Sequence, residues 1–265
     1  MGQGFKNICR LIDSAKEDVT PEQSFLGDLR RSIEMTEDKA VREPSRTYKP
    51  SSMNCIRNMY YQVIGQQRDT QISSYSIVGI CNSGTDTHER IQKYVADMKN
   101  NGMDCEYVNV ADYVRENNLD YLEIVEQKGM ETKLYHKTLN MSFLCDGIIK
   151  YKGKYYILEL KTESSGKWLS RKGVDPKHYA QGTSYSIAFH INEVIFVYIN
   201  RDILEMKSFM FIPTEEQKSE LINKILECDN YVSQKKVPPK PTELPRSTCE
   251  WCAYRGSCRM EIETD

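Results

Sequence analysis

The stretch CDGIIKYKGKYYILELKT, residues 145–162, decides the fold because it predicts a β-hairpin with a carboxylate on each arm. Two apolar arms flank Lys152-Gly153, and a two-residue loop that contains glycine is a hairpin signal. With this pair as the loop, the register places Asp146 directly opposite Glu159. Side chains alternate between the faces of a strand, so Lys161 lies on the same face as Glu159.

The other face of the hairpin is apolar and suits a protein core; it carries Cys145, Gly147, Ile149, Tyr156, Leu158 and Leu160. Like charges opposite each other destabilise a sheet, so the two carboxylates need a cation between them, or one must stay protonated. A hard divalent cation such as Mg²⁺ or Mn²⁺ prefers carboxylate and carbonyl oxygens. Asp146, Glu159 and the backbone carbonyl of Leu160 would supply such oxygens. Lys161 would bind a phosphate or orient an attacking water. The alternative is an exposed strand edge with accidental charges.

Composition limits the class of protein. The chain has 265 residues, enough for one large domain or two small ones, and its 28% charged and 39% hydrophobic residues are typical of a soluble globular protein. No apolar run approaches the ~20 residues of a membrane span, and the N-terminal MGQGFKNICR has no apolar signal core. We therefore expect a cytoplasmic protein without membrane contact. A net charge of −2 excludes a polycation, so any nucleic-acid site must be a local patch.

Hydrophobic periodicity divides the chain into helices and strands. Residues 1–46 are highly charged and predict an N-terminal extension of short helices. Further helices are predicted at 84–100, 177–190 and 214–233, and strands at 122–127, 132–139, 193–200 and 203–212. Residues 71–81 are expected to form a short strand or buried segment, 101–120 an irregular stretch with at most one short helix, and 162–176 a polar loop.

Two helices carry candidate site residues. In the helix at 84–100, which we expect to start near Asp86, His88 lies on the apolar side formed by Ile91, Tyr94, Val95 and Met98. From there it can reach the hairpin as a further metal ligand, although a buried histidine with satisfied hydrogen bonds is the alternative. In the helix at 177–190, Gln181 and Tyr185 share one face, since they are four residues apart. They can contact a nucleotide or shape the metal site, or they are ordinary helix surface.

The cysteines indicate a metal or cluster site. The chain has nine cysteines and no signal peptide, which favours metal binding over disulfides. Cys249, Cys252 and Cys258 place three thiols within ten residues, and an iron–sulfur cluster or a structural zinc needs a fourth. Cys55 is the candidate for the fourth ligand. Free thiols are the alternative.

A basic stretch between residues 150 and 177 surrounds one tryptophan. Its candidate DNA-binding residues are Lys167, Trp168, Arg171 and Lys172. An exposed aromatic ring among cations suits single-stranded nucleic acid, by base stacking and phosphate contact. A solvated loop is the alternative.

Taken together, five short motifs occur in an order that resembles one family. They are GxxxHE (Gly84–Glu89), DG (Asp146–Gly147), ELK (Glu159–Lys161), QxxxY (Gln181–Tyr185) and CxxCx₅C (Cys249–Cys258). This order resembles the RecB-like branch of the PD-(D/E)XK nucleases. It most resembles the members with a C-terminal iron–sulfur cluster, which are the Cas-four-type nucleases associated with CRISPR systems and the nuclease domain of AddB. The resemblance runs from about Tyr48 to Cys258, with Cys145 where the family pattern often has proline.

The resemblance implies an α/β protein with a restriction-endonuclease-like core, in which helices flank a mixed central sheet. It also implies a helical region stapled by a [4Fe–4S] cluster, with zinc as the alternative metal. Residues 47–258 would be one nuclease domain and 259–265 a tail. The cluster region would combine the segment around Cys55 with residues 245–258.

The same resemblance assigns roles to individual residues. His88, Asp146 and Glu159 would bind Mg²⁺ or Mn²⁺ together with the Leu160 carbonyl. The catalytic set would be Asp146, Glu159, Lys161, Gln181 and Tyr185. Glu131 is a weaker match to a further acidic position of the family.

The expected function is metal-dependent hydrolysis of phosphodiester bonds in DNA. The resemblance points to a single-strand-preferring exonuclease with additional endonuclease activity. It would act on DNA with free ends in recombination or repair, phage DNA processing or CRISPR adaptation, with a protein partner in such a complex. Two alternatives stay open: a non-catalytic or regulatory DNA- or protein-binding subunit on a nuclease scaffold, and a zinc-stabilised DNA-binding module.

Overall fold

The computed structural model describes residues 20–38, 43–69, 74–241, 244, 246–250 and 252–260. The chain divides into two compact units. One comprises Met1–Arg42 and Gln71–Cys81, and the other comprises Glu43–Thr70 and Asn82–Asp265. Within the described ranges, no helix combines the length and the apolar character needed to cross a membrane.

The smaller unit is helical where it is described. It contains α2 (Pro21–Asp38) and the first residues of α4 (Tyr75–Asp97). The Glu34 carboxylate accepts the N–H of Tyr75 at 3.0 Å, and the Arg30 guanidinium lies over the Tyr75 ring. Within the N-terminal extension predicted as short helices, the structure describes one longer helix, α2, while residues 1–19 and 39–42 lie outside the described residues.

The larger unit is built on a five-stranded mixed sheet with the order β1-β5-β6-β7-β8. The strands are β1 (Cys105–Val108), β5 (Gly147–Tyr151), β6 (Lys154–Glu163), β7 (Val194–Asn200) and β8 (Met206–Phe211). Strand β6 pairs antiparallel with β5 and parallel with β7. The predicted hairpin register is confirmed, since Gly147 pairs with Leu158 and Tyr151 with Lys154.

A second, antiparallel sheet precedes the hairpin. It consists of β2 (Leu122–Lys128), β3 (Glu131–His136) and β4 (Met141–Cys145). A single residue, Asp146, separates the end of β4 from the start of β5, so the chain passes from one sheet to the other there. This change of sheet is the feature of the fold that positions the candidate site.

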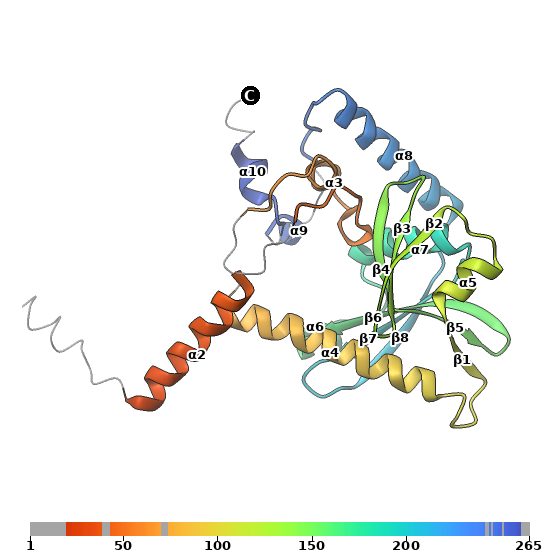
Figure 1. The fold of residues 1–265 in the computed structure, drawn as a ribbon, viewed down its shortest axis with the longest axis horizontal. Helices are drawn as coiled ribbons and strands as arrows, with labels where there is room; N and C mark the ends of the chain where they lie inside the picture. Colours follow the sequence, from red (N-terminus) through yellow and green to blue (C-terminus); the bar gives the residue numbers. More distant parts are fainter. Residues whose placement is uncertain are drawn as a thin grey trace, which may run out of the picture. The chain divides into compact units, whose positions relative to one another are not determined.

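Helices cover both faces of the central sheet (Figure 1). On one face, Ile91 and Val95 of α4, with Met98 just after it, pack against a core cluster that includes Leu158 and Leu160. On the other face, α7 (Tyr179–Phe189) and α8 (Glu215–Ser233) close a larger core, which contains Ile148, Ile157, Val194 and Phe196 of the sheet. Because β6 and β7 are central strands, apolar side chains are buried on both faces of the sheet. The predicted α/β class with a mixed sheet flanked by helices is confirmed.

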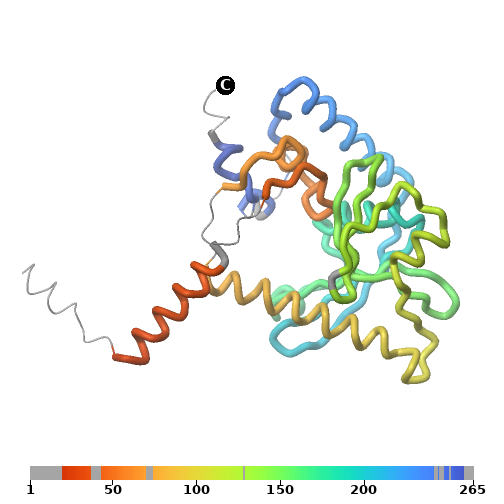
Figure 2. The backbone as a smooth tube through the Cα atoms, viewed as in Figure 1, coloured from red at the N-terminus to blue at the C-terminus, as the bar shows by residue number. Residues whose placement is uncertain are grey.

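Short helices complete the larger unit. They are the 3₁₀ helices η1 (Pro50–Ser52) and η2 (Pro176–His178) and the α-helices α3 (Ile56–Val63), α5 (Val110–Glu116), α6 (Ser165–Ser170), α9 (Arg246–Glu250) and α10 (Arg255–Met260). Figure 2 shows residues 43–69 running close to the C-terminal helices. The Asp69 carboxylate accepts the backbone N–H groups of Gly256 and Ser257 at the start of α10, so segments far apart in sequence are joined here.

Several local predictions were wrong. Residues 75–81 are helical, because α4 begins at Tyr75 rather than near Asp86, and most of their side chains are exposed. Tyr94 is 61% exposed and does not belong to the apolar side of α4. The stretch 101–120 contains β1 as well as α5, since pairing with β5 orders a polar edge strand. The expected loop 162–176 contains α6. Cys145 packs in the larger core rather than with Leu158.

Candidate metal-binding active site

Asp146 is held rigidly at the junction of the two sheets. Its carbonyl oxygen accepts hydrogen bonds from Gln92 Nε2 at 2.7 Å and from the Tyr107 hydroxyl at 2.6 Å. Its carboxylate Oδ2 accepts the N–H of Leu160 at 2.7 Å. With the main chain and one carboxylate oxygen fixed, the other oxygen, Oδ1, has a defined direction.

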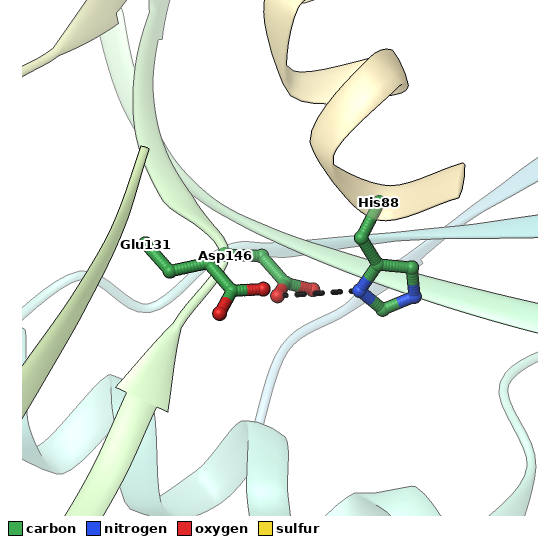
Figure 3. Close-up of side chains that lie close together, drawn as sticks. All are labelled: His88, Glu131 and Asp146. Atoms are coloured by element: carbon green, nitrogen blue, oxygen red, sulfur yellow. Dashed lines mark ion pairs between the residues drawn. The ribbon is translucent and has the colours of Figure 1, made fainter. Parts of the chain in front are cut away.

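Three potential ligand residues from different elements meet at this oxygen. His88 Nδ1 of α4 lies 3.5 Å from Asp146 Oδ1. Glu131, the first residue of β3, completes a group whose ligand atoms all lie within 4.8 Å of one another. Figure 3 shows the carboxylates of Glu131 and Asp146 next to each other, with the imidazole of His88 facing Asp146. One nitrogen and two carboxylates form a donor set that suits Mn²⁺ or Mg²⁺.

Gly84 allows His88 to come this close. A Cβ atom at Gly84 would lie 3.3 Å from Thr162 Oγ1, so α4 packs closely on β6 here and a larger residue would require the Thr162 side chain to shift. His88 is four residues later and therefore lies on the same face of the helix. The spacing GxxxH thus combines close packing with a ligand one turn further on.

Glu159 lies in a second, connected group of polar side chains. Its Oε1 accepts hydrogen bonds from Lys161 Nζ at 2.5 Å and Gln181 Nε2 at 2.7 Å. Lys161 Nζ also donates to Gln181 Oε1 at 3.0 Å. The Tyr185 hydroxyl lies 2.9 Å from Gln181 Nε2 and donates to the Leu144 carbonyl at 2.8 Å. Gln181 therefore orients the Glu159–Lys161 pair, and Tyr185 positions Gln181.

The electrostatics of the site fit a divalent cation. Burial raises the pKa of Glu159 despite the nearby ammonium of Lys161, and the charge of Asp146 adds to the rise. Burial lowers the pKa of His88, but the hydrogen bond and charge of Asp146 outweigh this effect and raise it. Glu159 Oε2 is buried and has no hydrogen-bond partner among the described residues. A cation beside this oxygen would compensate the buried negative charge.

Replacing Gly147 with alanine should weaken this site. The added Cβ would lie 2.7 Å from the ring of Tyr107, which holds the Asp146 carbonyl. We expect a loss of about 1–3 kcal/mol in the free energy of unfolding and weaker Mn²⁺ binding, because overpacking forces the ring to move. Urea unfolding and titration calorimetry would measure the two effects. Gly79→Ala is the control, since nothing lies within 4 Å of its added Cβ, and unchanged Mn²⁺ affinity in Gly147→Ala would contradict the prediction.

A cavity of about 280 Å³ opens next to Gln181 and Tyr185. Phe143, Leu144 and Pro50 provide apolar walls, and Lys49 and Lys133 are among the other lining residues. A hollow with apolar walls and nearby cations has the chemistry to accept an unpaired base and its phosphate.

The predicted DNA-binding residues fall into two groups. Trp168 is only 7% exposed, because Lys207 lies over its ring and its indole N–H donates to the Tyr198 carbonyl. The expectation of an exposed stacking ring is therefore wrong. The Arg171 guanidinium is half-buried and pairs with Glu163 and Asp175, which removes it from the surface available to phosphates. Lys167 and Lys172 are exposed.

All four predicted cluster cysteines line one cavity of about 490 Å³. They are Cys55, Cys249, Cys252 and Cys258. Among the described residues, these sulfurs do not form a group of three within 4.8 Å of one another. Four thiolates around a single Zn²⁺ would be about 3.8 Å apart, since each Zn–S bond is about 2.3 Å. The cavity and its four thiols leave both expected groups open, an iron–sulfur cluster and a structural zinc.

Two side chains next to Cys55 in sequence contact the other thiols. Arg57 Nη1 lies 3.4 Å from Cys258 Sγ, and Asn58 Nδ2 lies 3.6 Å from Cys252 Sγ. N–H donors of this kind stabilise the thiolate form that a cluster requires. Burial raises the pKa of the Cys55 and Cys252 thiols, and the neighbouring cysteines add to the rise.

Sequence reasoning did not find some residues that build the site. Gln92 lies one helical turn after His88, so its spacing was an available signal. Tyr107 lies on β1, in a stretch taken as irregular, and offered no signal. Glu131 was only a weak match to the family pattern, yet the structure places it beside His88 and Asp146. The Leu160 N–H contacts Asp146, while the role of the Leu160 carbonyl stays a prediction.

No protein-family model and no curated protein matches this chain. Among solved structures, the protein SSO0001 is 14% identical, with a TM-score of 0.43 over 88% of this chain and 96% of its own. An alkaline exonuclease (LHK-Exo) from Laribacter hongkongensis is 10% identical, with a TM-score of 0.44 over 72% of this chain and 90% of its own. Its complex with dAMP gives 11% identity and a TM-score of 0.43 over 72% and 89%. At such low similarity, the function of this chain must be argued from its own residues.

Proposed function

We propose that this protein is a metal-dependent nuclease that hydrolyses phosphodiester bonds in DNA. The observation that carries the proposal is the convergence of His88, Glu131 and Asp146 beside the buried Glu159–Lys161 pair. A structural ion pair alone does not account for three further ligand atoms within 4.8 Å of one another at the same junction. Like charges so close need a compensating cation or a retained proton, and the oxygen and nitrogen donors gathered here suit the cation.

The residues of the site have separate roles in hydrolysis. His88, Glu131, Asp146 and Glu159 would hold Mg²⁺ or Mn²⁺, with the Leu160 carbonyl as a further ligand. Such an ion lowers the pKa of a bound water and stabilises charge on the leaving oxygen. Lys161 orients the attacking water or neutralises the phosphate. Gln181 holds the side chains of Lys161 and Glu159 in position through its hydrogen bonds to both. Tyr185 acts by positioning Gln181.

The cavity beside Gln181 supports a preference for single strands. Phe143 and Leu144 present apolar surface there, and a base can occupy such a surface only when it is not paired. A strand entering from a free end meets this requirement without melting a duplex. We infer exonuclease action on single-stranded ends, of the kind needed in recombination, repair, phage DNA processing or CRISPR adaptation.

A [4Fe–4S] cluster on Cys55, Cys249, Cys252 and Cys258 completes the proposal. The four thiols line one cavity, and Arg57 and Asn58 supply N–H donors to two of the sulfurs. The cluster would supply a crosslink rather than redox chemistry. It would join the segment around Cys55 to residues 245–258 within a nuclease domain spanning 47–258.

A cleavage assay tests the proposed activity. End-labelled single- and double-stranded DNA is incubated with anaerobically purified protein and Mg²⁺, Mn²⁺ or EDTA. We expect metal-dependent shortening of the single strand from one end, faster than that of the duplex, and no cleavage with EDTA. A folded, cluster-loaded protein that cuts neither substrate with either metal would contradict the proposal.

A further inference from the structure

A small polar cavity is lined in part by Lys161, whose ammonium also contacts Glu159 and Gln181. Its volume is about 150 Å³, and its walls include Lys161, Lys167, Lys177, Arg201, His178 and Glu163. Four of these residues are cationic and one is acidic. The cavity therefore has the size and sign of a site for one phosphate group rather than for a base.

The acidic groups near the cavity are largely occupied by other partners. Glu163 is buried and is paired with Arg171 through both carboxylate oxygens. Asp202 accepts the backbone N–H and hydroxyl of Ser165, and its distance to Arg201 is 3.9 Å. The Glu163 charge at the cavity wall is therefore compensated by Arg171, and Asp202 is not among the lining residues.

The cations keep more freedom than the acids. Lys167 is exposed, and its ammonium has no partner among the described residues. Lys177 is half-exposed and pairs with Asp175 only at 3.5 Å. Exposed pairs of this kind contribute little, so either ammonium can turn to an incoming anion at small cost.

His178 adds a polar wall without adding charge. Its Nδ1 lies 2.9 Å from the Tyr198 hydroxyl, and its ring stacks on Phe196 and Tyr198. Burial, followed by the charges of Lys161 and Lys177, lowers the pKa of His178 to about 3. A neutral, fixed imidazole can share a hydrogen bond with a phosphate oxygen.

We propose that this cavity binds a second phosphate of the DNA strand, next to the phosphate that is cleaved at the metal site. Lys161 links the two positions, because its ammonium contacts Glu159 and its side chain lines the cavity. The proposal rests on the proposed nuclease function. The second phosphate is either an internal phosphodiester or the phosphomonoester at a strand end.

Direct binding tests the cavity without requiring cleavage. The protein carries Glu159→Gln so that DNA stays intact, and the probe is a fluorescent single-stranded oligonucleotide. We expect Lys167→Gln with Lys177→Gln to weaken binding about tenfold and to lower the salt slope of log K by about 0.7 in total, because both lysines serve one phosphate. Inorganic phosphate should compete with the oligonucleotide on the parent protein and lose this effect in the double variant. The control is Lys150→Gln, which removes one positive charge at an exposed position of β5 away from the cavity lining.

A second arm locates the phosphate. Oligonucleotides with one uncharged methylphosphonate linkage, moved stepwise along the strand, are compared with oligonucleotides ending in a phosphate or a hydroxyl. If the cavity binds an internal phosphodiester, a methylphosphonate at one position of the strand should weaken binding about tenfold in the parent protein. The same methylphosphonate should weaken binding no further in the double variant. If the cavity binds a terminal phosphomonoester, removal of the end phosphate should weaken binding to the parent protein and have no further effect in the double variant.

The outcomes separate this proposal from the proposed function. The phosphate site is wrong, whether or not the protein cuts DNA, if two results occur together. The first is that the double variant and Lys150→Gln weaken oligonucleotide binding equally. The second is that no methylphosphonate linkage and no missing end phosphate loses its effect on binding in the double variant. If phosphate binding is lost as expected but wild type never cleaves, the cavity stands and the nuclease proposal fails.

Discussion

Replacing Glu159 with glutamine should abolish metal-dependent DNA cleavage, with a loss in rate on the order of 10³-fold or more. Glutamine keeps the shape and one acceptor oxygen, so the hydrogen bonds from Lys161 and Gln181 can persist. It removes the charge that a divalent cation needs at this position. Because the change is nearly isosteric, a loss of activity would report on charge rather than on packing.

In the metal-free protein, Glu159→Gln should not lower the free energy of unfolding, although it abolishes activity. Glu159 is 2% exposed, its Oε2 has no hydrogen-bond partner, and Asp146 adds like charge nearby. Neutralising a buried, incompletely paired carboxylate removes a desolvation cost. We therefore expect Glu159→Gln to be as stable as wild type, or more stable by about 1 kcal/mol.

Lys161→Met provides the matched comparison. It removes the ammonium that lies 2.5 Å from Glu159 and leaves that carboxylate without a cation, so it should lose both activity and about 3 kcal/mol of stability. Thermal unfolding with and without Mn²⁺ would measure these effects, and Mn²⁺ should stabilise wild type but not Glu159→Gln. Glu106→Gln, on the exposed side of β1, should change neither quantity. A fully active Glu159→Gln protein would remove Glu159 from the mechanism.

Much of the site was predictable because its residues lie within regular elements. The Lys152-Gly153 loop fixes the register of the hairpin, and strand alternation then places Glu159 and Lys161 on one face. Helical periodicity likewise predicts that His88 points toward the sheet, and the structure places it 3.5 Å from Asp146.

Other contacts depend on how separate elements pack, which local patterns do not encode. Glu131 reaches Asp146 only because the chain changes sheets at that residue. Trp168 looked exposed because its neighbours in sequence are polar, yet β7 and Lys207 of β8 cover it. The sequence between residues 150 and 177 is rich in basic residues. However, two of the basic residues that line the cavity beside Lys161, Lys177 and Arg201, follow α6 in the chain.

Replacing Cys252 with serine should prevent cluster assembly and destabilise the larger unit. Residues 56–248 separate the first cluster cysteine from the second, so the crosslink closes a very long loop. A crosslink of this length is worth about 4–5 kcal/mol by loop entropy alone. We expect a colourless protein with a lower unfolding temperature and rapid proteolysis after α8.

Loss of the cluster should also weaken DNA binding, because residues next to Cys55 contact elements that carry site residues. Asn54 Nδ2 donates to the Lys177 carbonyl at 2.8 Å, and the Ser184 hydroxyl lies 3.5 Å from Met53 Sδ. The segment that carries Cys55 therefore packs against η2 and α7, which present Lys177 and Gln181. Cys252→Ser should bind single-stranded DNA more weakly than wild type, even at temperatures where its sheet remains folded.

Iron, sulfide and zinc analysis together with visible absorption would decide between the possible metals. Wild type should be brown, with iron and sulfide in equal amounts, and Cys81→Ser should look the same, since Cys81 is exposed and does not line the cavity. A colourless wild type with one zinc per chain would contradict the iron–sulfur assignment while keeping the crosslink. If Cys252→Ser unfolds like wild type and binds DNA equally well, the four cysteines do not hold the C-terminal segment to the segment around Cys55.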